Sequence, residues 1–305
     1  MSLQGKRVLL TGNTGFIGSH LGRRLSALGA DLYIAPHSQF HDLERGAMWI
    51  HLKPEIVFHC AGKTSGAGVV KHNPFALVNP NLIMTAHALA AAHDAGARAF
   101  IFPSSTTGYP PYAHPMREDE FHGALFEGYR TIGTVKRFLE QLAALYPMTT
   151  VALRISNAFG PGDQFDPVKA HVVAATVRKV AERRDPVQVW GDGSEIRDAL
   201  YIDDVVDAMI LAAEWSLEQP AGTHEAFNIG RGVGHSVYEI LSQLLVLEDH
   251  HPAVEFDTTK PTLLPTRLVD VSKAREVLGF EAKVGMTDGL SRTLRWFKAQ
   301  TGGAL

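Results

Sequence analysis

The stretch that decides the fold is residues 11–18, TGNTGFIG, which follows a short apolar run at residues 6–10 and precedes a helix-like pattern at residues 17–28. Glycines in a strand-to-helix turn let the backbone reverse sharply, and they let a pyrophosphate approach the N–H groups at the helix N-terminus. Gly12, Gly15 and Gly18 follow one another at intervals of three residues. In the usual dehydrogenase fingerprint, G-x-G-x-x-G, the first interval is two residues and the second is three. We therefore predict a dinucleotide site here, with a purely structural tight turn as the plainer alternative.

Outward from this turn, apolar strand-like runs alternate with helical patterns. The strand-like runs lie at residues 31–35, 56–60, 99–102 and 150–155, and the helical patterns lie at residues 81–95, opened by Asn81, and 129–145. Strands that are apolar throughout and separated by helices are typical of a parallel sheet buried on both faces. The predicted fold class is α/β, a doubly wound parallel (Rossmann) sheet with a smaller, interleaved C-terminal substrate lobe.

The chain of 305 residues is long enough for about two domains. Beyond Gly160 the regular alternation weakens, and Pro, Asp and His become more frequent. We expect a dinucleotide-binding Rossmann domain over residues 1–160 and a mainly substrate-binding lobe over residues 161–305. The helical pattern within residues 198–216 is expected to pack back on the Rossmann domain.

Composition and charge exclude several classes of protein. The chain is 45% hydrophobic and 20% charged with a net charge of −3, which favours neither disorder nor binding to nucleic acid. Cys60 is the only cysteine and no apolar window approaches the length of a membrane span, so we expect a cytoplasmic enzyme with no membrane partner. The fifteen histidines show no metal-site spacing, so no bound metal is expected.

The end of the second strand bears on the choice of cofactor. An acidic residue about 20 residues after the turn typically holds the adenosine ribose of NAD, and an arginine there accommodates the 2′-phosphate of NADP. Here the strand ends in residues 35–38, APHS, without a carboxylate or an arginine, and Asp31 comes too early. Because His37 and Ser38 can donate hydrogen bonds, NADP is slightly favoured over NAD.

Further motifs follow in order along the chain, namely VFHCAG at residues 57–62, SSTTGY at 104–109, RISNAFGP at 154–161 and YIDD at 201–204. With the first turn they resemble the extended short-chain dehydrogenases, the NAD-dependent epimerase/dehydratase family that modifies nucleotide sugars, over essentially the whole chain. Lys63 and the pattern from Gly160 to His171 are most similar to the GDP-L-fucose synthase subgroup. The resemblance implies a nucleotide-sugar substrate and a homodimer formed by the helices at residues 81–95 and 129–145.

The resemblance also implies two sets of binding residues. Those expected to contact the NADP or NAD cofactor are Gly12, Asn13, Thr14, Gly15, Phe16, Ile17, Gly18, His37, Asp42, Leu43, Cys60, Ala61, Gly62 and Lys63. Those expected to contact the substrate are Thr106, Thr107, Asn157, Arg197, Lys260 and Arg267. Arg197 is assigned to the substrate diphosphate because a guanidinium fork matches phosphate oxygens.

Three residues are the predicted catalytic groups. Hydride transfer at a sugar carbon needs a partner that gives or takes the hydroxyl proton, and Tyr129 is the candidate, with Ser105 aligning the reacting oxygen and His171 assisting. The family places a lysine four residues after its tyrosine, where this chain has Gly133. Lys136 lies on the same helical face about 10.5 Å farther along the axis. Lys136 and the loop residue Lys63 are the alternative cations.

These departures leave three functions open. Thr107 stands where the fucose synthases carry a catalytic cysteine, and an alkyl hydroxyl lacks the acidity of a thiol. The first prediction is therefore an NAD(P)-dependent reductase or limited epimerase of a GDP- or other NDP-sugar. The alternative is an NDP-sugar 4-epimerase with tightly bound NAD. The second alternative is a catalytically impaired regulatory protein that binds dinucleotide and sugar, because Gly133 replaces the expected lysine.

Overall fold

A computed structural model describes residues 2–35, 51–64, 75–260 and 264–302. Its largest sheet has six strands in the order β2-β1-β3-β4-β5-β9, and every neighbouring pair is parallel. The strands are β1 (Arg7–Thr11), β2 (Asp31–Ala35), β3 (Ile56–His59), β4 (Ala99–Ser105), β5 (Thr149–Ile155) and β9 (His224–Ile229). The sheet is the parallel one predicted from the apolar runs.

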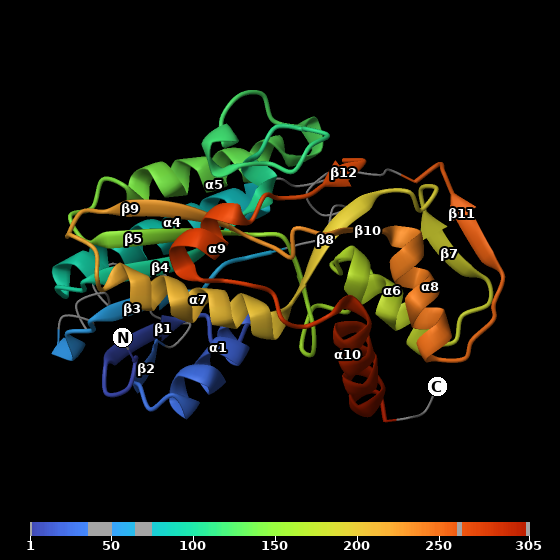
Figure 1. The fold of residues 1–305 in the computed structure, drawn as a ribbon, viewed down its shortest axis with the longest axis horizontal. Helices are drawn as coiled ribbons and strands as arrows, with labels where there is room; N and C mark the ends of the chain where they lie inside the picture. The colour runs from blue at the N-terminus through green and yellow to red at the C-terminus, as the bar shows by residue number, and fades with distance from the viewer. Residues whose placement is uncertain (1, 36–50, 65–74, 261–263, 303–305) are drawn as a thin grey trace.

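Helices cover both faces of this sheet (Figure 1). The pair α1 (Phe16–Ala27) and α7 (Ile202–Ser216) lies on one face, and the pair α4 (Phe75–Asp94) and α5 (Arg130–Ala143) lies on the other. Successive strand residues point to opposite faces, so Leu10 packs in the core that includes Leu21 of α1, and Leu9 packs in the core that includes Leu89 of α4. Burial of both faces explains why the strands are apolar throughout, and the doubly wound fold is confirmed.

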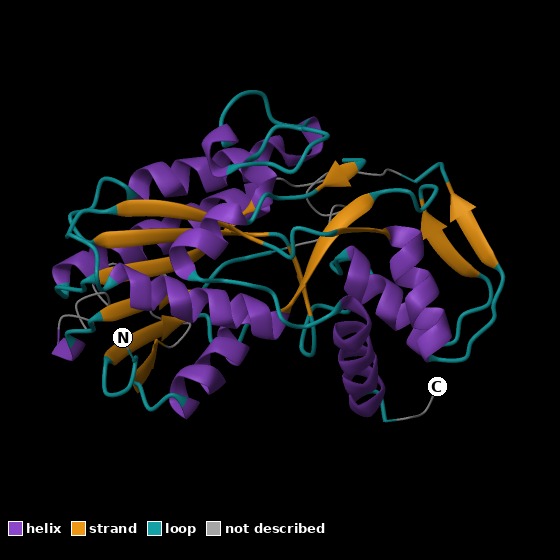
Figure 2. Ribbon diagram, in the orientation of Figure 1, coloured by secondary structure: helices purple, strands orange, loops and turns teal. Residues whose placement is uncertain are grey.

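The second lobe contains two smaller sheets (Figure 2). Strands β10 (Gly234–Ser236), β8 (Ile196–Tyr201) and β12 (Thr266–Arg267) are adjacent, and β6 (Asn157–Phe159) also pairs with β8. Strands β7 (Val187–Trp190) and β11 (Val254–Asp257) form a two-stranded sheet. The lobe's helices are α6 (Val172–Ala181), α8 (Val237–Leu247) and α10 (Met286–Gln300), whereas α9 (Ser272–Leu278) lies against β9.

The chain passes between the lobes more often than the sequence indicates. Helix α7 packs on β4 and β5, as expected for the helical segment within residues 198–216. Strand β9 was not foreseen, and it comes from the C-terminal half to complete the six-stranded sheet beside β5. Conversely, β6 precedes residue 160 but pairs with β8 of the second lobe. The domain boundary at residue 160 stays a prediction.

The start of α4 corrects a prediction. The helix begins at Phe75, so Asn81 does not open it, and Pro80 lies within it. A proline usually marks a helix boundary, so Pro80 directly before Asn81 is a local signal that this helix overrides. The Asn81 side chain instead accepts a hydrogen bond from Lys63 N at 2.8 Å and donates to Lys63 O at 2.9 Å. Among the described helices, α4 alone has the length and apolar composition of a membrane span, but it packs against β3 and α5.

Candidate active site

The glycine-rich turn after β1 is tightly packed against the end of β3. Gly12 has a φ of 73°, and a Cβ added there would lie 2.5 Å from Ala61 N. A Cβ on Gly18 would overlap Gly12 O. Gly15 is the N-cap of α1 and no side chain caps the helix there, so the N–H groups of its first turn are available to an anion. Close packing therefore requires glycine at Gly12 and Gly18, and the uncapped start of α1 is where a dinucleotide pyrophosphate is expected.

The loop after β3 lies next to this turn, at the carboxyl edge of the parallel sheet. Thr11 Oγ1 lies 2.9 Å from His59 Nδ1 and accepts a hydrogen bond from Ala61 N at 3.2 Å, which ties the ends of β1 and β3 together. Burial raises the pKa of the Cys60 thiol to about 12, so this cysteine stays protonated. The Lys63 side chain is exposed. The predicted cofactor contacts His37, Asp42 and Leu43 lie outside the described residues.

Close packing explains why no side chain stands at residue 133. Gly133 is buried, and a Cβ there would lie 2.5 Å from Thr107 O and 3.1 Å from a methyl group of Leu125. Helix α5 thus lies directly against the short 3-10 helix η3 (Thr106–Gly108). A lysine at residue 133 would have to push the helix away from this segment.

Lys136 is the cation that α5 brings to the carboxyl half of β4. Its Nζ donates a hydrogen bond to Pro103 O at 3.0 Å, and burial lowers its pKa to about 8. Burial, together with the charge of Lys136, lowers the pKa of His59 to about 3. Ile132 stands four residues before Lys136. If Lys136 is the lysine of a Tyr-x-x-x-Lys motif, isoleucine therefore occupies the position of the tyrosine.

Ser105 ends β4 and is half-buried. Its hydroxyl oxygen accepts hydrogen bonds from Thr107 N at 3.2 Å and from Thr107 Oγ1 at 3.1 Å, and Thr106 between them is buried. These contacts hold the Ser105 hydroxyl at the carboxyl end of the parallel strands, the edge at which ligands bind in open α/β sheets. The role of Ser105 in aligning a substrate oxygen stays a prediction.

Tyr129 lies directly before α5, at the end of the 3-10 helix η5 (Glu127–Tyr129), and is half-buried. The guanidinium carbon of Arg267 lies over its ring, 4.1 Å from the centroid. Arg267 belongs to β12 of the second lobe, so this contact joins the two lobes. Two of the predicted site residues, one catalytic and one for substrate, are therefore brought into direct contact.

Arg197 and Arg267 form a buried pair of like charges. They are directly opposite each other in the β8–β12 ladder, and each is only 9% exposed. Arg197 donates to the carbonyls of Ile196 and Leu264, whereas Nε and Nη2 of Arg267 have no hydrogen-bond partner, and in the described ranges no ion pair joins either arginine to a carboxylate. Burial lowers the pKa of both, yet a guanidinium stays charged in proteins. Opposed like charges are unfavourable, so the pair is suited to an anion.

The remaining predicted residues, one catalytic and two for the substrate, lie in different places. His171 precedes α6, and desolvation and the charge of Arg267 both lower its pKa, which favours the neutral imidazole at pH 7. Asn157 is half-buried at the start of β6, where the chain enters the second lobe. Lys260 is exposed after β11, with its N–H bonded to Asp257 O at 3.2 Å. Tyr129, His171, Arg197 and Arg267 thus form one cluster, and Lys260 is peripheral.

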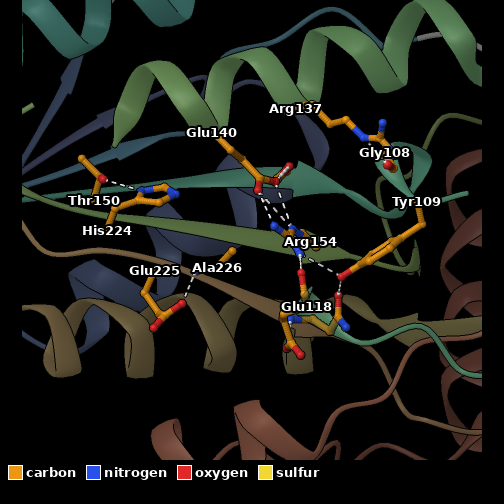
Figure 3. Close-up of polar contacts among 12 residues, drawn as sticks. Gly108, Tyr109, Glu118, Arg137, Glu140, Thr150, Arg154, His224, Glu225 and Ala226 are labelled. Atoms are coloured by element: carbon orange, nitrogen blue, oxygen red, sulfur yellow. Dashed lines mark hydrogen bonds and ion pairs between the residues drawn. The ribbon is translucent and has the colours of Figure 1, made fainter. Parts of the chain in front are cut away.

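A buried network under the site was missed by sequence reasoning (Figure 3). Arg154 Nη2 donates to Glu140 Oε2 at 2.7 Å and Arg154 Nη1 donates to the Tyr109 hydroxyl at 2.9 Å. Tyr109 in turn donates to Asn228 Oδ1 at 2.6 Å, and Ser104 donates to Glu140. An arginine within the apolar strand at residues 150–155 was the available signal, because a buried charge requires a partner.

A family model decides the identification. The model of the NAD dependent epimerase/dehydratase family matches residues 8–230. The chain belongs to this family. The dTDP-4-dehydro-6-deoxy-D-allose reductase of Streptomyces bikiniensis is 28% identical over 97% of this chain and 98% of that protein. The GDP-L-fucose synthase of Escherichia coli K12 is also 28% identical, over 96% of each chain.

Solved structures agree with this membership. The UDP-glucose 4-epimerase of Thermotoga maritima, solved with UDP-glucose, has a TM-score of 0.83 and 27% identity over 96% of this chain and 99% of that chain. The UDP-glucose-4-epimerase of Stenotrophomonas maltophila has a TM-score of 0.86 at 24% identity, over 98% of this chain and 100% of that chain, and shows the same fold. The similarity extends over both lobes of this family member.

Proposed function

We propose that this family member is an NAD(P)-dependent reductase or limited epimerase of a nucleotide sugar. The observation that carries the proposal is the Arg197–Arg267 pair, which is buried, forms no ion pair with a carboxylate among the described residues, and contacts Tyr129 through Arg267. A diphosphate supplies the negative charge that this pair lacks and matches the guanidinium donors. Relatives named as reductases of a dTDP-sugar and synthases of a GDP-sugar support a substrate of this class.

The described residues suit a proton-coupled reduction. A bound dihydronicotinamide would supply the hydride, and its dinucleotide would fit the glycine turn, where no side chain caps the first turn of α1. Ser105 aligns the substrate carbonyl, and Tyr129 donates the proton to the oxygen that gains negative charge. Lys136 is better placed than the exposed Lys63 to hold the nicotinamide ribose, because its ammonium lies beside the carboxyl half of β4.

A second candidate function rests on Ile132. Lys136 has isoleucine, not tyrosine, four residues before it, and Tyr129 contacts Arg267 of the second lobe. A protein that binds dinucleotide and nucleotide sugar without turnover is consistent with this arrangement. The 4-epimerase alternative requires oxidation of the sugar, which depends more strongly on a proton acceptor and is therefore less favoured.

The deciding experiment measures cofactor oxidation. Purified protein is incubated with NADPH or NADH and a panel of 4-keto GDP-, dTDP- and UDP-sugars, alongside Tyr129→Phe and Ile132→Tyr variants. Oxidation that falls at least about a hundredfold in Tyr129→Phe supports Tyr129 as the proton donor. Full activity in Tyr129→Phe excludes that role. Tight binding of both ligands without turnover, with activity appearing only in Ile132→Tyr, supports the binding protein.

The same preparations test the remaining proposals on cofactor, assembly and location. We propose a slight preference for NADP over NAD, which the ratio of the two dissociation constants measures. We also propose a homodimer through α4 and α5, where Phe75, Ile83 and Phe138 are 68%, 48% and 50% exposed. Sedimentation should then show a dimer for the wild type and a monomer for Phe138→Glu. Fractionation of the source cells tests the proposed cytoplasmic location.

A further inference from the structure

We propose that Tyr129 has a second role, in which the face of its ring holds the Arg267 guanidinium in place for the diphosphate of the substrate. The inference rests on the proposed function and deepens it. It assigns to the aromatic ring a part in nucleotide binding that is separate from the proton-transfer role of the hydroxyl. Nucleotide binding should then require the ring of Tyr129 but not its oxygen.

The position of Arg267 gives the first argument. Arg267 belongs to a strand of only two residues, β12, and faces Arg197 directly across the ladder. Repulsion between the two guanidinium groups opposes this arrangement, and within the described part of the chain no hydrogen-bond partner holds Nε and Nη2 of Arg267. The Tyr129 ring, 4.1 Å below the guanidinium carbon, presents its electron-rich face to the charge.

The contrast with Arg154 gives the second argument. The Arg154 guanidinium also lies over a ring, 3.6 Å from the centroid of Phe121, but the Glu140 carboxylate binds it and cancels its charge. An aromatic face attracts a guanidinium without neutralising it. Arg267 is thus held in place while its charge stays unneutralised and its buried Nε and Nη2 have no acceptor among the described residues, which suits it to a phosphate.

The location of Tyr129 gives the third argument. The residue directly precedes α5 of the Rossmann domain, and its partner Arg267 is in the second lobe. The contact therefore sets the distance between the diphosphate-binding group and the proton donor. A nucleoside diphosphate sugar bound at Arg267 would have its sugar placed relative to the Tyr129 hydroxyl by one direct contact.

Calorimetric titration of GDP and UDP into the full chain tests this role without any need for turnover. Tyr129→Phe, which keeps the ring, should bind like the wild type. Tyr129→Leu, which keeps apolar volume but has no aromatic face, should bind about fivefold more weakly. Tyr129→Trp should restore the affinity. Adding Tyr129→Leu to an Arg267→Gln variant should produce no further loss, because the two residues act through one contact.

Each result has a defined meaning. Equal affinity of Tyr129→Leu and the wild type overturns the second role while leaving the proposed function intact. A full additional loss in the Arg267→Gln background overturns the pairing, since the ring would then act elsewhere. Absence of GDP and UDP binding in the wild type overturns the proposed function together with this inference. Thermal unfolding of each variant checks folding, and Tyr129→Ala is the second ring-free variant if Tyr129→Leu folds poorly.

Discussion

Buried arginines occur in both lobes, and their surroundings differ. In the Rossmann domain, Arg154 has the Glu140 carboxylate, the Tyr109 hydroxyl and Glu118 O as hydrogen-bond acceptors. In the second lobe, and among the residues that the structure describes, Arg197 donates to the backbone carbonyls of Ile196 and Leu264, and Arg267 has two donor groups without acceptors. In the first arrangement the guanidinium charge is paired and hydrogen-bonded, which stabilises the fold. The second leaves a charge unsatisfied, which is costly for folding and useful for binding an anion.

The largest effect expected from this comparison is on stability. Arg154→Met should lower the free energy of unfolding by about 3–5 kcal/mol, because Glu140 would remain buried without its partner. Urea denaturation measures this loss. The matched control is the exposed pair of Asp288 and Arg292 on α10, where Arg292→Met should change the free energy of unfolding far less, because water screens the pair. Equal costs at the two sites would contradict the stabilising role of the buried Arg154–Glu140 pair.

The second prediction concerns ligand-dependent stability. GDP or UDP at about a hundred times its dissociation constant should raise the free energy of unfolding by about 2.7 kcal/mol in the wild type, since only the folded state binds it. The increase should disappear in an Arg197→Met, Arg267→Met double variant. Denaturation with and without nucleotide measures both values. An increase that persists in the double variant would place the nucleotide at another site.

The third prediction separates binding from stability at one arginine. Arg197→Met should weaken GDP or UDP binding about thirtyfold, the equivalent of about 2 kcal/mol for lost charged hydrogen bonds. Without nucleotide, the variant should be as stable as the wild type or more stable, because repulsion from Arg267 is removed. Calorimetry and urea denaturation check the two parts. A large loss of stability would show that Arg197 is structural like Arg154.

The smallest expected effect concerns a buried acid that, unlike an arginine, can lose its charge by binding a proton. Burial raises the pKa of Asp163 from 3.8 to about 7, and its Oδ2 has no hydrogen-bond partner. The folded state therefore binds more protons than the unfolded state between these values, so this group's contribution to stability falls as the pH rises from about 4 to 7. Asp163→Asn should become more stable relative to the wild type as the pH rises from 5 to 8, because asparagine has no charge that must be buried. Urea denaturation at both pH values measures the gain, and an unchanged difference would contradict it.

The Rossmann domain was the more predictable region because its signals are local. The apolar strands, the glycine turn at residues 11–18 and the return of α7 to the sheet depend on the periodicity and turn chemistry of short segments. The starting point of α4 was wrong because Pro80 is a boundary signal that tertiary packing overrode. Strand β9 was missed because its place in the sheet depends on pairing with β5, which is distant in sequence.

Residue types and spacing alone determined that this chain builds a doubly wound sheet with a glycine cradle at its first turn, and that Gly133 stands where a family lysine was expected. Only the tertiary structure decided that Thr107 O leaves no room for a side chain there, and that Lys136 reaches the sheet edge. It also decided that Arg267 rests on Tyr129. Periodicity and turn preferences act within a few residues of sequence, whereas these contacts depend on strand register and helix packing between distant segments.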